Sequence, residues 1–264
     1  MNCYPGWFMK LLRVTICASA LICFENPLLA WGPTGHRVVG RVADRHLSKQ
    51  AAQAVKDLLG QDTLAEAGTW ADDIRPDLKW NHAAPWHYVT VEDNQTYETS
   101  KKNPRGDVIE AIRRFEAALR NPGSTREEKA VAVKFLVHFI GDLHQPLHVG
   151  RGADQGGNGT QVVWFQNKTN LHAVWDNSII ESERLSFSEF YEFLDKPTAG
   201  EIAKWRSSGV LDWAAESFNA RKSVYDLGNG KLGYEYAYRH LPFVKLRLMQ
   251  AGIRLSGLLN SVLK

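Results

Sequence analysis

Cysteine is almost missing from this chain. Its three cysteines, Cys3, Cys17 and Cys23, all lie within the first thirty of its 264 residues. A chain that loses this segment is stable without disulfides and cannot use thiolate chemistry. Any metal site in it must therefore be built from nitrogen and oxygen ligands.

The chain also lacks an excess of charge of one sign. It carries 32 Lys and Arg residues against 29 Asp and Glu residues, and removal of the first thirty residues leaves 30 against 28. This near-balance argues against binding of duplex nucleic acid through a broad basic face. It does not exclude a local phosphate site.

Only one apolar run resembles a targeting segment. Lys10 and Arg13 give it a basic start, residues 14–24 are apolar, and "PLLA" ends it at Ala30. The run is too short for a comfortable membrane span, and nothing later replaces it. We expect residues 1–30 to be a signal peptide that is cleaved before Trp31. The mature protein would then be secreted or periplasmic, without a membrane anchor or an evident obligate protein partner.

Helical spacing of apolar residues dominates the rest of the chain. Ser48 is placed to N-cap one helix, which Gly60 ends, and Asp107 is placed to open another. The expected helices of this first half cover residues 33–47, 49–59 and 107–120.

A long apolar helix is expected to follow. Ser124 and Glu127 have the spacing of a capping box before it, and Pro146 is expected to terminate it. Residues 70–102 are loop-rich and include a short extended "WHYVTVED", while "QVVWF" is typical of a strand. No repeat or linker divides residues 31–264, so the sequence predicts one mainly helical, all-α domain.

Two His–Asp pairs carry most of the chemical information. His138 and Asp142 are four residues apart, as are His172 and Asp176, so each pair lies on one face of a helix. For one isolated pair, a hydrogen bond within the helix is the commoner explanation. However, the first pair lies in the apolar stretch "FLVHFIGDLHQPLH", where a charge is costly unless it is coordinated.

Further potential ligands lie close by in the sequence. His148 follows the first pair, "TWADDIRP" supplies Asp72 and Arg75, and "APWHYV" supplies His87. Imidazole and carboxylate without sulfur suit a catalytic zinc site. Because these groups exceed what one tetrahedral ion can use, more than one metal is expected, an arrangement typical of phosphoester hydrolysis.

These residues resemble the S1/P1 nuclease family over nearly all of residues 31–264. The resemblance is carried by "WGPTGH", "TWADDIR", "WHYVTVED", "FLVHFIGDLHQPLH", "GGNGTQV" and "NLHAVWD". It implies a helical fold of the phospholipase C/P1 nuclease type and three Zn²⁺ ions. It also implies hydrolysis of single-stranded DNA and RNA to products with a 5'-phosphate and a free 3'-hydroxyl, together with hydrolysis of 3'-nucleotides. The lack of cysteine pairs favours a bacterial-type member of the family.

The resemblance also implies which residues hold the metals. The free amine and carbonyl of Trp31 would chelate one ion, because a terminal amine with a pKa near ~8 is readily deprotonated by a metal. Asp142 would bridge this ion to a second. The full set implied is Trp31, His36 and Asp142 for the first ion, Asp72, His87, His138 and Asp142 for the second, and His148, His172 and Asp176 for the third.

Other positions are expected to bind substrate. Arg75, together with Asp72, is the candidate for stabilising charge in the transition state. Tyr88 stands where fungal members have a base-stacking phenylalanine, and Thr90 stands where they carry an aspartate that reads the base edge. Asn158 is a further candidate for the same slot, although Gly-Gly-Asn is also an ordinary turn.

Two other functions fit the same metal residues. A zinc-dependent phospholipase C has a related reaction and architecture, but it needs an acid beside an aromatic cage to bind choline, and no such motif is evident. A non-catalytic zinc-binding protein would gain nothing from a positioned Arg75.

Overall fold

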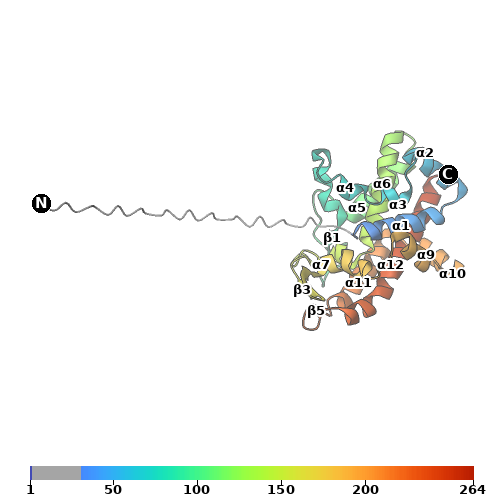
Figure 1. The fold of residues 1–264 in the computed structure, drawn as a ribbon. Helices are drawn as coiled ribbons and strands as arrows, with labels where there is room; N and C mark the ends of the chain where they lie inside the picture. The colour runs from blue at the N-terminus through green and yellow to red at the C-terminus, as the bar shows by residue number, and fades with distance from the viewer. Residues whose placement is uncertain (2–30) are drawn as a thin grey trace.

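The computed structural model describes Met1 and residues 31–264, and its first helix is α1 (Pro33–Arg45) (Figure 1). Residues 2–30, where the signal peptide is expected, lie outside the described residues. Pro33 opens α1 well because a helix leaves the first N–H groups unpaired and proline has none. Within the described residues no helix is both long enough and apolar enough to cross a lipid bilayer.

Helices account for most of the described chain, which confirms the expected fold class. In the first half they are α2 (Lys49–Leu59), α3 (Leu64–Ala67), α4 (Trp70–Asp73), the 3₁₀ helix η1 (Leu78–His87), α5 (Val108–Arg120) and α6 (Arg126–Leu143). In the second half they are the 3₁₀ helix η2 (Pro146–His148), α7 (Leu171–Ala173), the π-helical turn η3 (Val174–Ser178), α8 (Ile179–Glu181), α9 (Phe187–Leu194), α10 (Ala199–Arg206), α11 (Val210–Val224) and α12 (Tyr234–Val262).

Short strands complete the fold. β1 (Val89–Thr90) and β2 (Val149–Gly150) pair in parallel. β3 (Gln161–Trp164) lies between β4 (Asn167–Asn170) and β5 (Lys231–Leu232), antiparallel to the former and parallel to the latter. The extended segment expected in "WHYVTVED" is therefore reduced to two residues. Its first two residues, Trp86 and His87, end the 3₁₀ helix η1, and within the described residues β1 pairs with β2 alone.

Helix capping agrees with the sequence at two positions and differs at one. Ser48 accepts a hydrogen bond from the N–H of Ala51, and Asp107 accepts from two N–H groups of α5, both as expected. The capping box of α6 is formed by Thr125 and Glu128, so the prediction of Ser124 and Glu127 is wrong. The N–H of Ser124 is taken by the carbonyl of Asn121 in the preceding turn, so the helix starts one residue later.

Helix α6 forms the centre of the molecule. Every residue from Phe135 to Gly150 is buried, through the end of α6, η2 and β2. The Phe135 ring stacks on Phe115 of α5 and on Phe139, with centroids 4.6 and 5.0 Å apart. Truncation of such a core phenylalanine costs about 3–5 kcal/mol of stability. The potential ligands on α6 are thus held in a rigid, water-poor environment.

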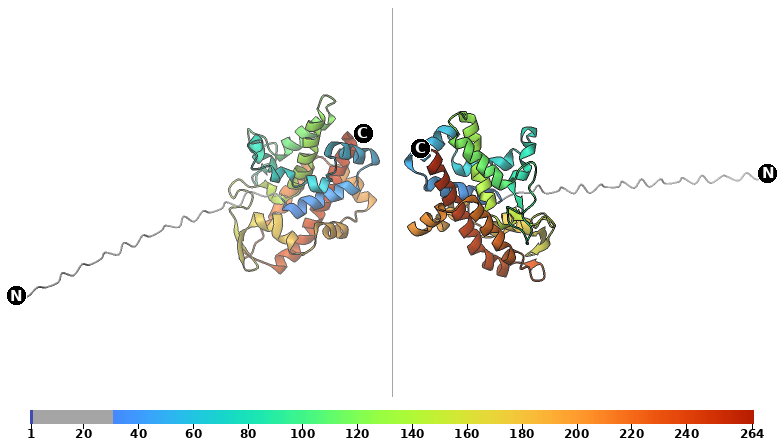
Figure 2. Two further views of the ribbon diagram at one scale, coloured as in Figure 1. Left: turned by 45° about the horizontal axis from the view of Figure 1, so that its top comes forward. Right: turned by 180° about the vertical axis from the view of Figure 1, so that it is seen from behind.

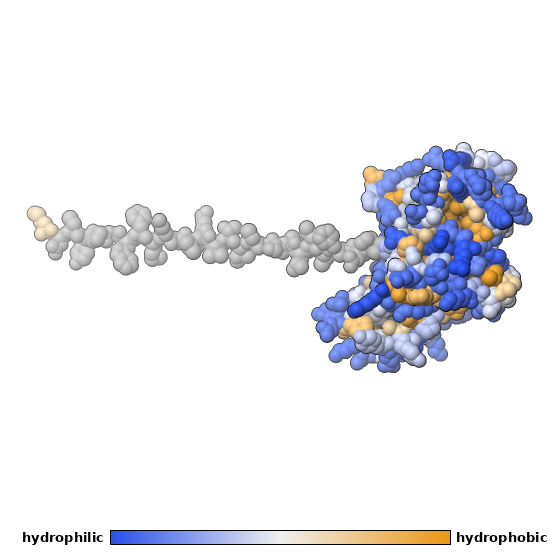
Figure 3. All heavy atoms as spheres, turned by 45° about the vertical axis from the view of Figure 1, so that its right-hand side comes forward, coloured by the Kyte–Doolittle hydropathy of each residue, from blue (hydrophilic) through white to orange (hydrophobic). Residues whose placement is uncertain are grey.

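Helix α1 packs tightly between α3 and α12, and α12 crosses the back of the molecule (Figure 2). A Cβ at Gly40 would lie 2.3 Å from the carbonyl oxygen of Leu64, and one at Gly252 would lie 2.5 Å from the Cβ of Val42. Only glycine fits at these contacts, so they fix the position of α1 relative to α3 and α12. The surface shown in Figure 3 is mainly hydrophilic, with apolar residues in small groups.

Candidate metal centre

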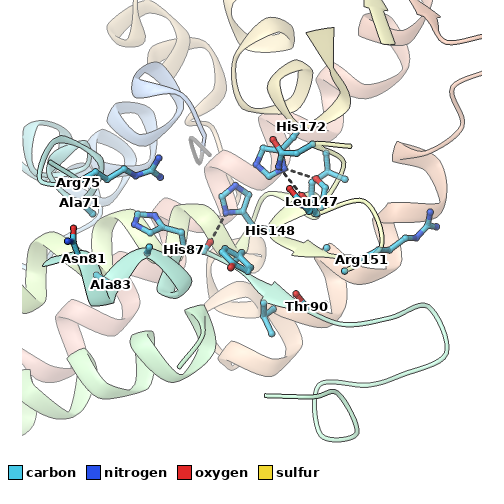
Figure 4. Close-up of a pocket in the computed structure, with 18 of the residues that line it drawn as sticks. Ala71, Arg75, Asn81, Ala83, His87, Thr90, Leu147, His148, Arg151 and His172 are labelled. Atoms are coloured by element: carbon cyan, nitrogen blue, oxygen red, sulfur yellow. Dashed lines mark hydrogen bonds between the residues drawn. The ribbon is translucent and has the colours of Figure 1, made fainter. Parts of the chain in front are cut away.

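A cavity of about 590 Å³ opens beside α6, between η1 and the loop that follows β2 (Figure 4). Its walls contain seven of the residues singled out in the sequence. These are Arg75, His87, Tyr88, Thr90, His148, Asn158 and His172. All the other expected ligands except Trp31 belong to the side-chain groups behind its inner wall.

Three groups of His and Asp side chains meet there, each with one potential ligand atom per residue within 4.8 Å of the others. His138 belongs to two of these groups, so the two are adjacent. The groups are His36, His138 and Asp142, then Asp72, His87 and His138, and then His148, His172 and Asp176.

Several separations in the first two groups are longer than ordinary hydrogen bonds and suit ligands of a shared ion. His36 Nε2 is 3.4 Å from Asp142 Oδ1, and His138 Nε2 is 3.4 Å from Asp142 Oδ2 and 3.5 Å from Asp72 Oδ1. The third group is tighter, with His172 Nε2 3.1 Å from Asp176 Oδ2, a distance that also fits a hydrogen bond. Ligand atoms about 2.0–2.2 Å from a tetrahedral zinc ion lie about 3.3–3.6 Å from one another.

Several buried polar atoms in these groups have no hydrogen-bond partner among the described residues. They are both ring nitrogens of His36, Asp142 Oδ1 and His148 Nε2. A buried polar atom without a partner costs about 1–3 kcal/mol, and such atoms call for an explanation. Coordination of metal ions would satisfy the Asp142 oxygen, the His148 nitrogen and one of the two ring nitrogens of His36, so the donor set fits metal binding.

Electrostatics point in the same direction. Burial lowers the pKa of His36 and of His87, and neighbouring His138 adds to both shifts. Both imidazoles are therefore neutral near pH 7, as a metal ligand requires. Burial, reinforced by Asp72, raises the pKa of Asp142 well above its ordinary value. Without a cation, this carboxylate is unfavourable where it stands.

The third group has a different balance. Burial acts to raise the pKa of Asp176, but the facing His172 and His148 outweigh it, so the pKa is lowered. Asp176 is therefore ionised in the folded protein. It is the natural anionic partner for a cation held by the two histidines.

Backbone carbonyls fix which nitrogen of each histidine faces its group. The Nδ1–H of His138 donates to Gly68, that of His148 to His87, and that of His172 to Gly156, at 2.7, 2.6 and 2.6 Å. Each ring thereby presents Nε2. His87 instead presents Nδ1, which lies 3.1 Å from Asp142 Oδ2 and from His138 Nε2.

Trp31 lies beside these groups and is fully buried. Its indole N–H donates to the carbonyl oxygen of Gly141 at 2.8 Å, one residue before Asp142. The N–H of Gly32 donates to the carbonyl oxygen of Asp176 at 2.7 Å. These two bonds tie the start of the described segment to residues of both the first and the third group.

Arg75 lies at one end of the cavity, and its guanidinium is 2.6 Å from Asp72 Oδ1. Asp72 thus belongs to a ligand group and also orients an arginine. Its neighbour Asp73 accepts a hydrogen bond from Thr69 at 3.0 Å and lies in none of the three groups.

The candidate substrate residues form the outer wall. Tyr88 and Thr90 flank Val89 of β1, and Asn158 of the glycine-rich loop also lines the cavity. The amide of Asn158 donates to the carbonyl oxygen of Gln155 at 2.9 Å. The histidines His46, His82, His144 and His240 belong to none of the three groups.

Gln145 is a residue that the sequence did not single out. It is fully buried, and its amide donates to Asp176 Oδ1 at 2.7 Å. In the sequence Gln145 is marked only by its position, midway between the potential ligands Asp142 and His148. No spacing rule marks an amide that supports a ligand from behind.

Comparison with known proteins assigns the chain to a family. The S1/P1 Nuclease family model matches residues 31–264. Endonuclease 4 of Arabidopsis thaliana is 32% identical over 97% of this chain and 94% of its own length. Nuclease S1 of Aspergillus oryzae is 27% identical over 95% of this chain and 98% of its own, and nuclease P1 of Penicillium citrinum is 34% identical over 55% and 57%.

The chain therefore belongs to the S1/P1 nuclease family. It is an enzyme, a hydrolase that acts on the phosphodiester bonds of nucleic acids.

Proposed function

We propose that this S1/P1-type nuclease is a zinc-dependent endonuclease that cleaves single-stranded DNA and RNA, leaves 5'-phosphate products, and also hydrolyses 3'-nucleotides. The observation that carries the proposal is the convergence of three His/Asp groups on the inner wall of one cavity that also holds Arg75 and Tyr88.

The nitrogen and oxygen donors suit three Zn²⁺ ions. Trp31, His36 and Asp142 would hold the first ion, and Asp72, His87, His138 and a second oxygen of Asp142 would hold the next. The third ion would take the remaining group, His148, His172 and Asp176. When bound, zinc lowers the pKa of water to about 7 and offsets charge on phosphate oxygens.

Arg75 would act on the phosphate directly. Its guanidinium is anchored by Asp72 at 2.6 Å, and a quarter of the side chain is exposed, so the remaining donors can reach a phosphate oxygen in the cavity. A planar guanidinium bonds two oxygens at once. Since charge on those oxygens grows in the transition state, Arg75 would stabilise that state more than the bound substrate.

Tyr88 would select single strands. Its ring lines the cavity next to His87, where an unpaired base can stack on it for about 1–3 kcal/mol regardless of sequence. A base within a duplex is already stacked and paired, so it cannot enter. Thr90 offers a hydroxyl in place of a carboxylate, and Asn158 lines the same cavity. We therefore propose a weak base preference.

The N-terminal amine of a mature chain would complete the first site. The indole of Trp31 is bonded to Gly141 and buried, so the adjacent backbone is held close to Asp142. With its own carbonyl, a free amine forms a five-membered chelate. An amide nitrogen in an uncleaved chain cannot replace it, so processing would control activity.

We further propose that the protein is exported, as a secreted or periplasmic enzyme, with its signal peptide cut before Trp31. This rests on the basic and apolar residues that precede Trp31. The relatives named above come from a plant and from fungi, so a bacterial type rests on the lack of cysteine pairs alone.

The cavity favours a nuclease over a phospholipase C. Among its described lining residues there is no carboxylate, although Trp80 and Tyr88 supply aromatic faces. A choline ammonium would lack the opposite charge that such a site needs. Phosphate, by contrast, finds Arg75 at the same wall.

The test compares a preparation that starts at Trp31 with one that carries an additional N-terminal alanine. For both, zinc per chain is measured by mass spectrometry, and rates are measured on single-stranded DNA, RNA, duplex DNA, a 3'-nucleotide and a phosphatidylcholine. The extension is expected to remove close to one zinc and most of the nuclease activity.

Other results would count against the proposal. Equal zinc and equal rates in both preparations would refute the terminal chelate. Cleavage of phosphatidylcholine without cleavage of single strands would establish the phospholipase function instead. Bound zinc with no hydrolysis of any ester would indicate a zinc-binding protein.

A further inference from the structure

Arg151 lies at the end of the cavity away from Arg75, with His87, His148 and Thr90 between them (Figure 4). It follows His148 by three residues and comes directly after β2. The sequence patterns did not single it out, and the three ligand groups do not contain it.

The backbone that carries Arg151 is held firmly. β2 pairs with β1 through Val149 and Gly150. A Cβ at Gly150 would lie 2.5 Å from both Gly156 Cα and the carbonyl oxygen of Leu147. The segment therefore has little freedom to shift, and the origin of the Arg151 side chain is fixed relative to His148.

The guanidinium is also oriented before any ligand arrives. Its Nε–H donates to Asp93 Oδ1 at 3.0 Å, and its Cζ lies 4.1 Å from the ring centroid of Tyr225. The Tyr225 hydroxyl donates in turn to Asp154 at 2.7 Å, so the ring is itself fixed. Such ordering lowers the entropy lost when an anion binds.

Its two terminal amino groups are left open. Within the described chain, the bonds of Arg151 are confined to its Nε, and the side chain is 30% exposed. Asp93 does not neutralise it fully, because the same carboxylate also accepts from Arg221 at 2.9 Å. A partly exposed, oriented guanidinium whose two terminal amino groups can still donate hydrogen bonds fits an oxyanion such as phosphate.

The size of the cavity and the spacing of the two arginines suggest which phosphate this is. The proposed function puts the scissile phosphate beside the ligand groups and Arg75. A second arginine at the far end is useful only to a substrate with a second phosphate. A polynucleotide has one phosphate per nucleotide, whereas a 3'-nucleotide has only the one that is removed.

We propose that Arg151 binds a phosphate of the single strand next to the scissile one, and thereby favours polynucleotides over mononucleotides. The inference rests on the proposed function for its substrate. It adds a phosphate subsite that the ligand groups do not supply.

The test measures kcat/KM of Arg151→Gln on a short single-stranded oligonucleotide and on a 3'-nucleotide. On the oligonucleotide kcat/KM is expected to fall roughly tenfold, mainly through KM, because a charge-assisted bond is lost. On the 3'-nucleotide it should stay within about twofold of the unaltered enzyme. The slope of log affinity against log salt should fall in magnitude by about 0.7, the value for one contact to a single strand.

Two variants serve as controls. Arg239→Gln removes an arginine that is likewise paired with an aspartate, Asp226, and lies near a tyrosine ring, but outside the cavity. It should leave both substrates unaffected. Arg151→Lys keeps the charge but not the fork of donors, so it should restore much of the salt slope and only part of the affinity.

The proposal is overturned if Arg151→Gln lowers both substrates equally, which would indicate a disturbed metal centre, or if it lowers neither. A fluorescent oligothymidylate with phosphorothioate linkages, followed by anisotropy, separates this result from failure of the proposed function. If the unaltered enzyme cleaves no single strand, the proposed function fails. Whether or not strands are cleaved, the subsite is refuted if Arg151→Gln binds the oligothymidylate as tightly as the unaltered enzyme does.

Discussion

The amide of Gln145 and the imidazole of His172 approach different oxygens of the same carboxylate. Gln145 donates to Asp176 Oδ1 at 2.7 Å, and His172 Nε2 faces Oδ2 at 3.1 Å. The carbonyl of Gln145 also accepts from the N–H of Leu147 at 2.6 Å. The side chain is thus bonded at both ends and fixes the orientation of Asp176.

Replacement of Gln145 by leucine should loosen Asp176 and weaken the third metal site. Loss of such a supporting partner typically costs 10–100-fold in metal affinity or activity. Zinc retention against a chelator and the single-strand rate would measure this. Gln53→Leu, on the exposed face of α2, is the control, and equal zinc retention in the two variants would contradict the prediction.

Arg75→Lys should slow the reaction and leave zinc in place. Lysine keeps the charge but lacks the rigid planar fork that holds donors toward Asp72 and phosphate oxygens together, and loss of one preorganised donor costs roughly 10²–10³ in kcat. The measurement is kcat together with zinc content. Arg120→Lys alters an exposed helical pair with Glu116 and should have no effect. A loss of zinc in Arg75→Lys would assign Arg75 a structural role through Asp72.

Asp44 should make stability depend on pH. Burial raises its pKa to about 6 from an unfolded value of 3.8, and the N–H of Leu64 offsets this only in part. Because the folded pKa is the higher one, protonation favours folding, and stability is lost as pH rises between these two values.

Asp44→Asn removes this dependence. The variant should be more stable than the unaltered protein near pH 7, by up to about 3 kcal/mol, and no more stable near pH 4. Urea unfolding at both pH values is the measurement. Asp57→Asn, an exposed position on α2, serves as the control. A gain at low pH alone would reverse the assigned sign.

Glu216→Gln should destabilise the fold. Glu216 accepts from Arg254 through both oxygens, at 2.6 and 2.7 Å, and pairs with Arg247. Both arginines are almost fully buried, and burial lowers the pKa of Arg247 to about 10. Removal of their common anion would leave two charges uncompensated and cost about 3 kcal/mol.

Thermal and urea unfolding of Glu216→Gln would measure this loss, with Glu189→Gln at the exposed capping box of α9 as a milder comparison. A change no larger than that of Glu189→Gln would show that solvent compensates the arginines. The same network holds the end of α6, since Arg247 donates to the carbonyl oxygen of His144.

Local patterns in the sequence were enough to predict α1, α2, α5 and α6 and the i,i+4 pairing of potential ligands. The i,i+4 spacing placed His138 beside Asp142 and His172 beside Asp176, and the structure has both pairs. The convergence of α1, η1 and α6 was not visible in any spacing. It depends on close backbone approaches, such as that of Gly68 to the carbonyl of His36, and it entered the sequence analysis only through the family resemblance.

The errors also have local causes. Ser124 and Thr125 are both hydroxyl residues followed by glutamate three positions later, so propensity alone cannot choose between them. In the structure the N–H of Ser124 is bonded to the carbonyl oxygen of Asn121 in the preceding turn, and Thr125 caps the helix. In "WHYVTVED" the alternation is typical of a strand, but a strand needs a partner of equal length. Residues such as Gln145 and Arg151 act through geometry and leave no periodic signal.

Trp31 and α1 stand at one end of the described chain, yet they are held by α12 at the other. Val42 of α1 meets Gly252 of α12 with no space for a side chain between them, and Trp31 is buried two residues before α1 begins. The packing that positions α1, and Trp31 just before it, is therefore complete only after α12 has been made and has docked. A chain that stops short of α12 would have all the ligand residues but would lack the helix against which α1 packs.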